Sequence, residues 1–173
     1  MPARQTLPTI WLMTDERLGE RLWDAIGRVT EGGGVVLRHH RGDRAFAERV
    51  AESCAARGLM LAVAGDVALA RAVGAAMVHN LASAANGLSV SRSVHDEREA
   101  VAARSADLLF VSPLYATRSH PGAERLGIAR ALALARMAGV PAIALGGMNE
   151  SRGAEAMAEG FHGWAGIDAF LRS

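Results

Sequence analysis

The chain has 173 residues, of which 19 are basic and 18 acidic, so its formal net charge at neutral pH is +1. Half of the residues are hydrophobic and 21% are charged, a balance typical of a globular protein that excludes a disordered or collagen-like chain. The near-neutral charge and the 5% share of aromatic residues argue against nucleic acid or a membrane surface as a partner. The length predicts a single domain over residues 1–173.

The sequence carries few signals of secretion or of a redox centre. Cys54 is the one cysteine, so the chain cannot form an internal disulfide and lacks the thiolates of a zinc ribbon or an iron–sulfur cluster. Residues 1–8 lack the apolar stretch of a signal peptide, and no run of about 18 apolar residues could span a membrane. We therefore expect a cytoplasmic protein.

Short apolar runs alternate along the chain with stretches of helical periodicity. Residues 9–13 predict a buried strand, and Leu18, Leu22 and Ile26 follow it four residues apart, as on one face of a helix. The same alternation recurs to the end of the chain. The predicted strands are 9–13, 35–37, 59–63, 76–78, 88–91, 107–111, 141–145 and 163–167. The later predicted helices follow Asp43, span 67–73, open at Asp96 with Glu99, span 128–137 and follow Asn149.

Eight strands that alternate with helices predict an α/β fold, a closed parallel (βα)8 barrel of the TIM type. Residues 81–87 are too few for a regular crossover helix, so we expect the helix between the fourth and fifth strands to be reduced or absent. The rival is an open doubly wound sheet, but no GxGxxG turn follows the first strand. The chain is shorter than the usual barrel of about 200 residues or more, and the missing helix accounts for part of the difference.

Most of the histidines follow predicted strands, where the active site of such a barrel lies. Imidazole suits proton transfer or metal binding near neutral pH, so this clustering predicts a site. A single loop histidine is more often simply solvated, and His95 also fits the entry of a helix. The histidines after strands are His39, His40, His79, His95 and His120, whereas His162 precedes the last strand and belongs to the opposite rim.

Acidic and glycine residues add to this picture. Asp15, like the other acids that stand where helices begin, is explained by capping. Asp168 differs because no long helix follows it, so we expect it at the mouth of the barrel. Gly146 and Gly147 follow the seventh strand, where backbone N–H groups commonly bind phosphate in these barrels. The loop 112–122 carries hydroxyls, an arginine and a histidine that no structural need explains.

Several segments in order resemble the thiamine phosphate synthases and the related thiazole tautomerases. They cover almost the whole chain and comprise residues 11–15, 35–38, 73–79, 93–95, 112–127 and 144–148. This resemblance implies a (βα)8 barrel. It also implies the synthase reaction, in which Mg²⁺ helps to join an aminopyrimidine methyl diphosphate to a thiazole phosphate with release of pyrophosphate.

The resemblance transfers to individual residues only in part. Arg38, Ser93 and Gly147 match substrate-binding positions, and Thr117 with Ser119 match a phosphate-binding Thr-x-Thr. Other positions differ: His39 and His40 replace Glu and Lys, Val36 replaces Gln, His120 replaces a Lys, and Asp168 replaces a Ser.

The metal-binding carboxylates of the synthase are also missing. The Asn-Asp pair falls on Ala64 and Gly65, with Asp66 one residue late, and the stretch 81–87 contains no acid. The catalytic histidine of the tautomerase falls on Ser112. We therefore assign no metal ligands, and we expect Mg²⁺ only if the synthase reaction is retained.

The resulting hypothesis is a synthase-like transferase with a small-molecule substrate, which could form a homodimer. We expect His40, His120 and Asp168 to converge on one cavity as catalytic residues. The expected substrate-binding residues are Arg38, His39, His79, Ser93, Thr117, Ser119, Gly146 and Gly147.

Three other functions stay open. The first is a metal-free isomerase or lyase with His40, His79 or His120 as base. The second is a non-catalytic binder of a small ligand. The third is a histidine-ligated zinc or iron hydrolase, although no HxH or HExxH spacing supports it.

Overall fold

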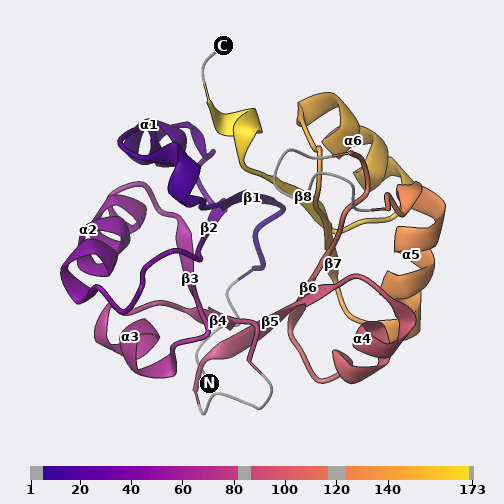
Figure 1. The fold of residues 1–173 in the computed structure, drawn as a ribbon, viewed down its shortest axis with the longest axis horizontal. Helices are drawn as coiled ribbons and strands as arrows, with labels where there is room; N and C mark the ends of the chain where they lie inside the picture. Colours follow the sequence, from indigo (N-terminus) through magenta and orange to yellow (C-terminus); the bar gives the residue numbers. More distant parts are fainter. Residues whose placement is uncertain (1–5, 82–86, 117–123, 172–173) are drawn as a thin grey trace.

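The computed structural model describes residues 6–81, 87–116 and 124–171 and confirms the predicted barrel. Eight parallel strands pair in chain order and close into a barrel, because β1 pairs with β8 as well as with β2. Leu12, for example, lies opposite Val35 on one side and Gly166 on the other. Figure 1 shows the strands as an inner ring with the helices outside it.

The elements lie within one or two residues of most predicted ranges. The strands are β1 Ile10–Met13, β2 Gly34–Leu37, β3 Met60–Ala64, β4 Met77–His79, β5 Ser89–Val94, β6 Leu108–Val111, β7 Ala142–Ala144 and β8 Gly163–Gly166. The α-helices are α1 Arg21–Arg28, α2 Arg44–Ala55, α3 Val67–Ala72, α4 Glu97–Ala102, α5 Gly127–Ala138 and α6 Glu150–Glu159. Two 3₁₀ turns, η1 Glu16–Leu18 and η2 Asp168–Phe170, follow β1 and β8.

The described residues of the link between β4 and β5, 80–81 and 87–88, contain no helix, and the expected reduction of the helix here concerns mainly the residues between them. Residues 82–86 of that link lie outside the described part of the chain. The chain therefore passes from β4 to β5 over residues 80–88, which is shorter than its other strand-to-strand connections with a full helix.

Alternate side chains of the strands fill the inside of the barrel. Trp11 packs edge-on against Phe110 with ring centroids 5.5 Å apart, and its indole N–H donates to Pro8 O at 2.9 Å. Gly34 on the neighbouring strand leaves the room that this indole occupies, because a Cβ there would meet the ring. The residues between these point outward and pack under the helices.

The predicted caps are confirmed, and they fix where the helices start at the carboxyl rim. Asp43, Asp66, Asp96 and Asn149 each accept a hydrogen bond from the backbone N–H three residues later. Asp15 caps η1 by accepting from Arg17 N at 3.0 Å. These side chains therefore have a structural role, whereas Asp168 at the same rim caps no described helix.

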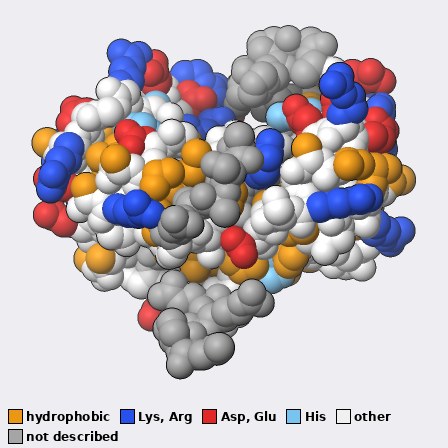
Figure 2. All heavy atoms as spheres, turned by 90° about the horizontal axis from the view of Figure 1, so that it is seen from below, with side chains coloured by type: hydrophobic (Ala, Val, Ile, Leu, Met, Phe, Trp, Pro, Cys, Tyr) orange, Lys and Arg blue, Asp and Glu red, His pale blue; other side chains and the backbone are white. Residues whose placement is uncertain are grey.

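The outer surface carries charges of both signs. Figure 2 shows basic and acidic side chains interspersed over one face, which agrees with the balanced composition. Among the described residues, no helix has both the length and the hydropathy needed to cross a membrane.

Replacing Gly163 by Ala is expected to destabilise the barrel by about 1–3 kcal/mol, because overpacking a rigid core forces the backbone to shift. A Cβ at Gly163 would collide with the backbone of Thr9, which is held by the Trp164 N–H to Thr9 O bond of 2.8 Å. The matched control is Gly27→Ala in α1, where a Cβ would meet nothing within 4 Å. That variant should gain about 0.5–1 kcal/mol from helix propensity. Urea unfolding of the three proteins measures both changes, and equal midpoints would contradict this packing.

Candidate active site

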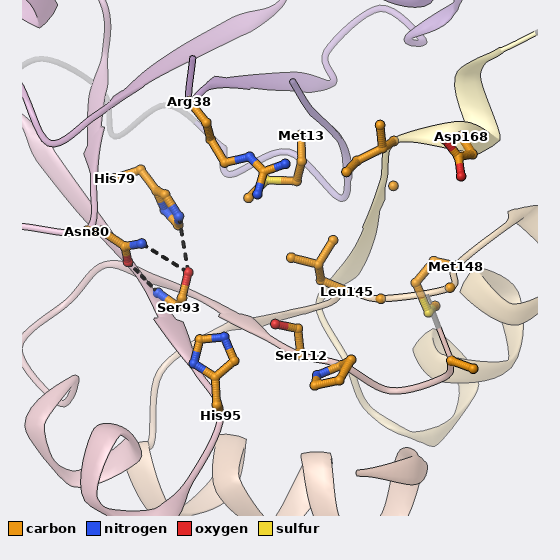
Figure 3. Close-up of a pocket in the computed structure, with 16 residues that line it drawn as sticks. Met13, Arg38, His79, Asn80, Ser93, His95, Ser112, Leu145, Met148 and Asp168 are labelled. Carbon is orange, nitrogen blue, oxygen red and sulfur yellow. Dashed lines mark hydrogen bonds between the residues drawn. The ribbon is translucent and has the colours of Figure 1, made fainter. Parts of the chain in front are cut away.

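One cavity of about 610 Å³ opens at the carboxyl ends of the strands, where the active sites of such barrels lie. Figure 3 shows side chains from strand ends around the ring turned toward it. It is lined by Met13, Arg38, His79, Asn80, Ser93, His95, Ser112, Pro113, Ala116, Leu145, Gly146, Gly147, Met148, Gly166, Ile167 and Asp168.

The cavity brings together six of the residues predicted from the sequence. They are Arg38, His79, Ser93, Gly146, Gly147 and Asp168. His39 and His40 lie after β2 but do not line it. Thr117, Ser119 and His120 fall outside the described residues, so their place in the site stays a prediction.

Arg38 supplies a fixed cation at the β1–β2 side of the cavity. Its Nε donates to Thr14 O at 2.9 Å, its backbone N–H donates to Thr14 Oγ1 at 3.0 Å, and its guanidinium lies 3.6 Å from an oxygen of Asp15. Burial lowers the pKa of Arg38, and Asp15 opposes that effect. The guanidinium is thus oriented before any ligand arrives, which reduces the entropic cost of binding an anion.

His79, Ser91, Ser93 and Asn80 form a hydrogen-bonded unit at the ends of β4 and β5. His79 Nδ1 lies 3.0 Å from Ser91 Oγ, and His79 Nε2 lies 3.2 Å from Ser93 Oγ. Asn80 Oδ1 accepts the Ser93 N–H at 2.7 Å, and Asn80 Nδ2 donates to Ser93 Oγ at 3.2 Å. Asn80 adopts a left-handed backbone conformation with φ +58°, which costs energy in a residue other than glycine.

Burial keeps the His79 ring neutral. Burial, with a smaller contribution from Arg38, lowers the pKa of His79 to about 3. A neutral imidazole has one N–H and one acceptor nitrogen, so each of its two serine partners faces a different role. His79 therefore holds the Ser93 hydroxyl in position at the cavity wall, and it does not supply a positive charge to a ligand.

His39 and His40 are engaged by the backbone and by neighbouring side chains. His40 Nε2 lies 2.8 Å from Ala64 O, and its Nδ1 accepts the Gly42 N–H at 3.1 Å. His39 Nδ1 lies 2.9 Å from Thr14 Oγ1, and burial lowers the pKa of His39. Both rings shape the loop after β2, and the catalytic role expected for His40 stays a prediction.

Gly146 and Gly147 allow the loop after β6 to lie directly on the loop after β7. Both have positive φ, +98° and +63°. A Cβ on Gly146 would lie 2.7 Å from Pro113 Cα, and one on Gly147 would lie 2.5 Å from Ala116 O. Within the described part of the chain, the Gly147 N–H donates to no other group, so it remains available to a ligand.

Asp168 places a carboxylate after the end of β8, on the lining of the same cavity as Gly146 and Gly147. Its side chain forms no hydrogen bond or ion pair with any described residue, although its charge helps to raise the pKa of Arg17. Met13, Leu145 and Met148 supply an apolar wall on this side. A carboxylate thus faces the place where barrels of this type commonly bind phosphate.

Sequence analysis did not assign several residues that line the cavity. Asn80 and Ser112 directly follow strands, and that position is the sequence signal for them, although neither side chain is charged. His95 belongs to the histidines expected at this rim, although its position also fits a helix entry, and Glu99 four residues later pairs with it. Met13 and Met148 are apolar, and no pattern separates them from core residues.

The residues at the end of β3 do not fit a Mg²⁺ site. Ala64 and Gly65 offer no carboxylate there, and one oxygen of Asp66 accepts the Leu69 N–H at 2.8 Å as a cap. Over residues 6–81, 87–116 and 124–171, no three His, Cys, Asp or Glu side chains lie close enough to share a metal ion. Mg²⁺ prefers several oxygen ligands, so the donor set on this side is too poor for it.

Sequence comparison relates the chain to known proteins. The profile of the family described as thiamine monophosphate synthase matches residues 11–170. A thiamine-phosphate synthase of Listeria innocua is 33% identical over 135 residues, which are 69% of this chain and 63% of the relative. One from Listeria monocytogenes is 32% identical over the same shares. The chain thus spans less than two thirds of the length of these curated relatives.

Solved structures give the same fold. A thiamine phosphate pyrophosphorylase from Pyrococcus furiosus has a TM-score of 0.77 at 22% identity and covers 96% of this chain and 88% of its own. One from Bacteroides thetaiotaomicron has a TM-score of 0.61 at 19% identity, with 94% and 84% covered. The profile match spans nearly the whole chain, and it includes the strand ends that form the cavity. The chain belongs to the thiamine monophosphate synthase family.

Proposed function

We propose that the cavity binds a thiazole phosphate and an aminopyrimidine and acts in the formation of thiamine phosphate. The observation that carries this proposal is the convergence of Arg38, Ser93 and Gly147 on one cavity. These are the residues that match substrate-binding positions of the synthases. The cavity of about 610 Å³ falls in the range of pockets that enclose a small organic ligand.

In this proposal, different residues bind different parts of the ligands. The Gly147 N–H and Arg38 meet the anionic groups of the ligands, and the Ser93 hydroxyl meets a ring nitrogen or an exocyclic amine. Met13 and Leu145 cover the faces of the rings. Mg²⁺ is expected only if the synthase reaction is retained, and among the described residues Arg38 is the one arginine on the lining that could meet the diphosphate of the pyrimidine.

The expected test is calorimetric titration with 4-methyl-5-(2-hydroxyethyl)thiazole phosphate and with the parent alcohol. Asp168→Asn should tighten binding of the phosphate ester by roughly tenfold, because a nearby like charge costs on the order of 1 kcal/mol or more. The affinity for the alcohol should stay the same. Glu159→Gln at the far end of α6 is the matched control, since it removes one charge outside the cavity and should change neither affinity.

Three outcomes decide between a synthase-type enzyme and a non-catalytic ligand-binding protein. Binding of both ligand classes with slow coupling supports a synthase-type enzyme, and binding with no coupling at all supports a non-catalytic ligand-binding protein. If neither the phosphate ester nor the alcohol binds at millimolar concentration, the proposed function is wrong.

A further inference from the structure

His95 and Glu99 form an ion pair at the edge of the cavity. His95 Nδ1 lies 2.8 Å from Glu99 Oε2, and the His95 backbone N–H donates to the same oxygen at 2.7 Å. Because a carboxylate can only accept here, the proton of the neutral imidazole is on Nδ1. Figure 3 shows the His95 ring projecting from the end of β5 toward the cavity.

Helix capping explains the position of the Glu99 carboxylate but not the presence of the His95 imidazole. Glu99 is the third residue of α4, and a side chain at that position commonly reaches back to a backbone N–H before the helix. That role needs no histidine at position 95. The second ring nitrogen, Nε2, forms no hydrogen bond with any described residue, although His95 lines the cavity.

Of the described histidines, His79 and His95 line the cavity, and His95 is the one placed to exchange a proton with a ligand. His79 is wedged between Ser91 and Ser93, and His40 uses both ring nitrogens on the backbone. His162 lies at the opposite rim, where its Nε2 is 3.1 Å from Leu7 O. The His95 side chain is 52% exposed, so a proton that it takes up can pass on to solvent.

We infer that His95 Nε2 is a general acid–base group for a ligand in this cavity and that Glu99 is its positioning residue. The arrangement has the three parts of such a unit: a free ring nitrogen facing the ligand, a proton on the other nitrogen, and a carboxylate that holds it. This inference rests on the proposed function. The ligand class that it names is a cationic heteroaromatic carbon acid, such as a thiazolium, and the cavity that would hold it is also lined by the carboxylate of Asp168.

The step moves one proton and leaves the ligand otherwise unchanged. The C2–H bond of the thiazolium breaks, its electron pair stays on C2 as the ylide, and an N–H bond forms at His95 Nε2. The resulting imidazolium donates from Nδ1 to Glu99, whose negative charge stabilises it. In D₂O the exposed imidazolium exchanges its proton with solvent and returns a deuteron to C2.

The experiment uses thiamine phosphate as the probe and follows the loss of its C2–H signal by NMR in D₂O. The wild-type protein should accelerate the exchange above the rate without protein. His95→Gln should lower the protein-dependent rate by roughly a hundredfold, which is the lower end of what a general base contributes. Glu99→Gln, which keeps an oxygen for the His95 N–H, should lower it by roughly tenfold or more.

Calorimetry on the same variants separates catalysis from binding. The dissociation constant of thiamine phosphate should change less than twofold in both variants, a split that a merely structural role of Glu99 would not produce. His162→Gln is the matched control and should alter neither quantity. Tight binding without acceleration, or full acceleration by His95→Gln, overturns the inference and leaves the proposed function standing. Absence of binding overturns both.

Discussion

The purified protein is expected to couple the aminopyrimidine diphosphate to the thiazole phosphate at least about a thousandfold more slowly than a family member with intact motifs. Loss of one preorganised electrostatic partner costs roughly 10²- to 10³-fold in rate, and here more than one is replaced. Ala64 and Gly65 stand where the metal-binding pair is expected, and all 19 basic residues are arginine, so no lysine can meet the departing pyrophosphate. Pyrophosphate release in the presence of Mg²⁺ measures this rate.

A single restored carboxylate should not rescue the reaction. Gly65 has φ +69°, and a Cβ there would meet nothing within 4 Å, so Gly65→Asp adds an acid in open space at the cost of some backbone strain. One carboxylate does not complete the ligand set of Mg²⁺. Gly65→Asn is the matched control, because it carries the same strain without the charge. Both variants should stay within about threefold of the wild type. Vigorous Mg²⁺-dependent turnover by the unmodified protein would show that Asp66 or the substrate phosphates hold the metal.

The fold could be predicted from the sequence because its signals are local and repeat. Most of the buried runs precede a cap, as at Asp43 and Asn149, and the structure places those caps where the spacing predicts them. The order of the strands also shows which residues lie at the carboxyl rim of the barrel, since a residue that directly follows a parallel strand must lie at the carboxyl end. Asp168 is found at the cavity for this reason.

The roles of the histidines could not be predicted in the same way, because they depend on what each ring nitrogen contacts. His40 and His95 both follow strands in the sequence. In the structure His40 is tied to Ala64 and Gly42, whereas His95 keeps one nitrogen toward the cavity. These contacts join residues from different loops, and they are set by the backbone path of each loop. The unit of His79 with Ser91 likewise depends on the register of β4 against β5, in which the two residues lie opposite each other.

The buried imidazole of His79 should make the protein sensitive to mild acid. In the unfolded chain a histidine has a pKa near 6.5, whereas burial lowers the pKa of His79 to about 3 in the folded protein. Above pH 6.5 both states are neutral, and no stability is lost. As the pH falls below 6.5, the unfolded state binds a proton at this histidine and the folded state does not. The free energy of unfolding therefore decreases by up to about 1.4 kcal/mol per pH unit until the pH reaches the pKa of the folded state.

The measurement compares urea unfolding of the wild type and of His79→Gln between pH 7 and pH 5, a window above the titration of most carboxylates. The wild type should lose roughly 1.5–2 kcal/mol more than the variant over this interval. A change in the absolute stability of the variant does not affect the result, because the measurement compares how steeply the free energy of unfolding changes with pH in each protein. The lowered pKa of His39 contributes to both proteins and cancels, and His162→Gln should keep the full slope. Equal slopes in wild type and His79→Gln would mean that the ring accepts a proton in the folded barrel. Ser93 would then face a protonated His79, and the cavity would hold a second positive charge in addition to Arg38. A diphosphate needs such a second positive charge, which a neutral His79 does not supply.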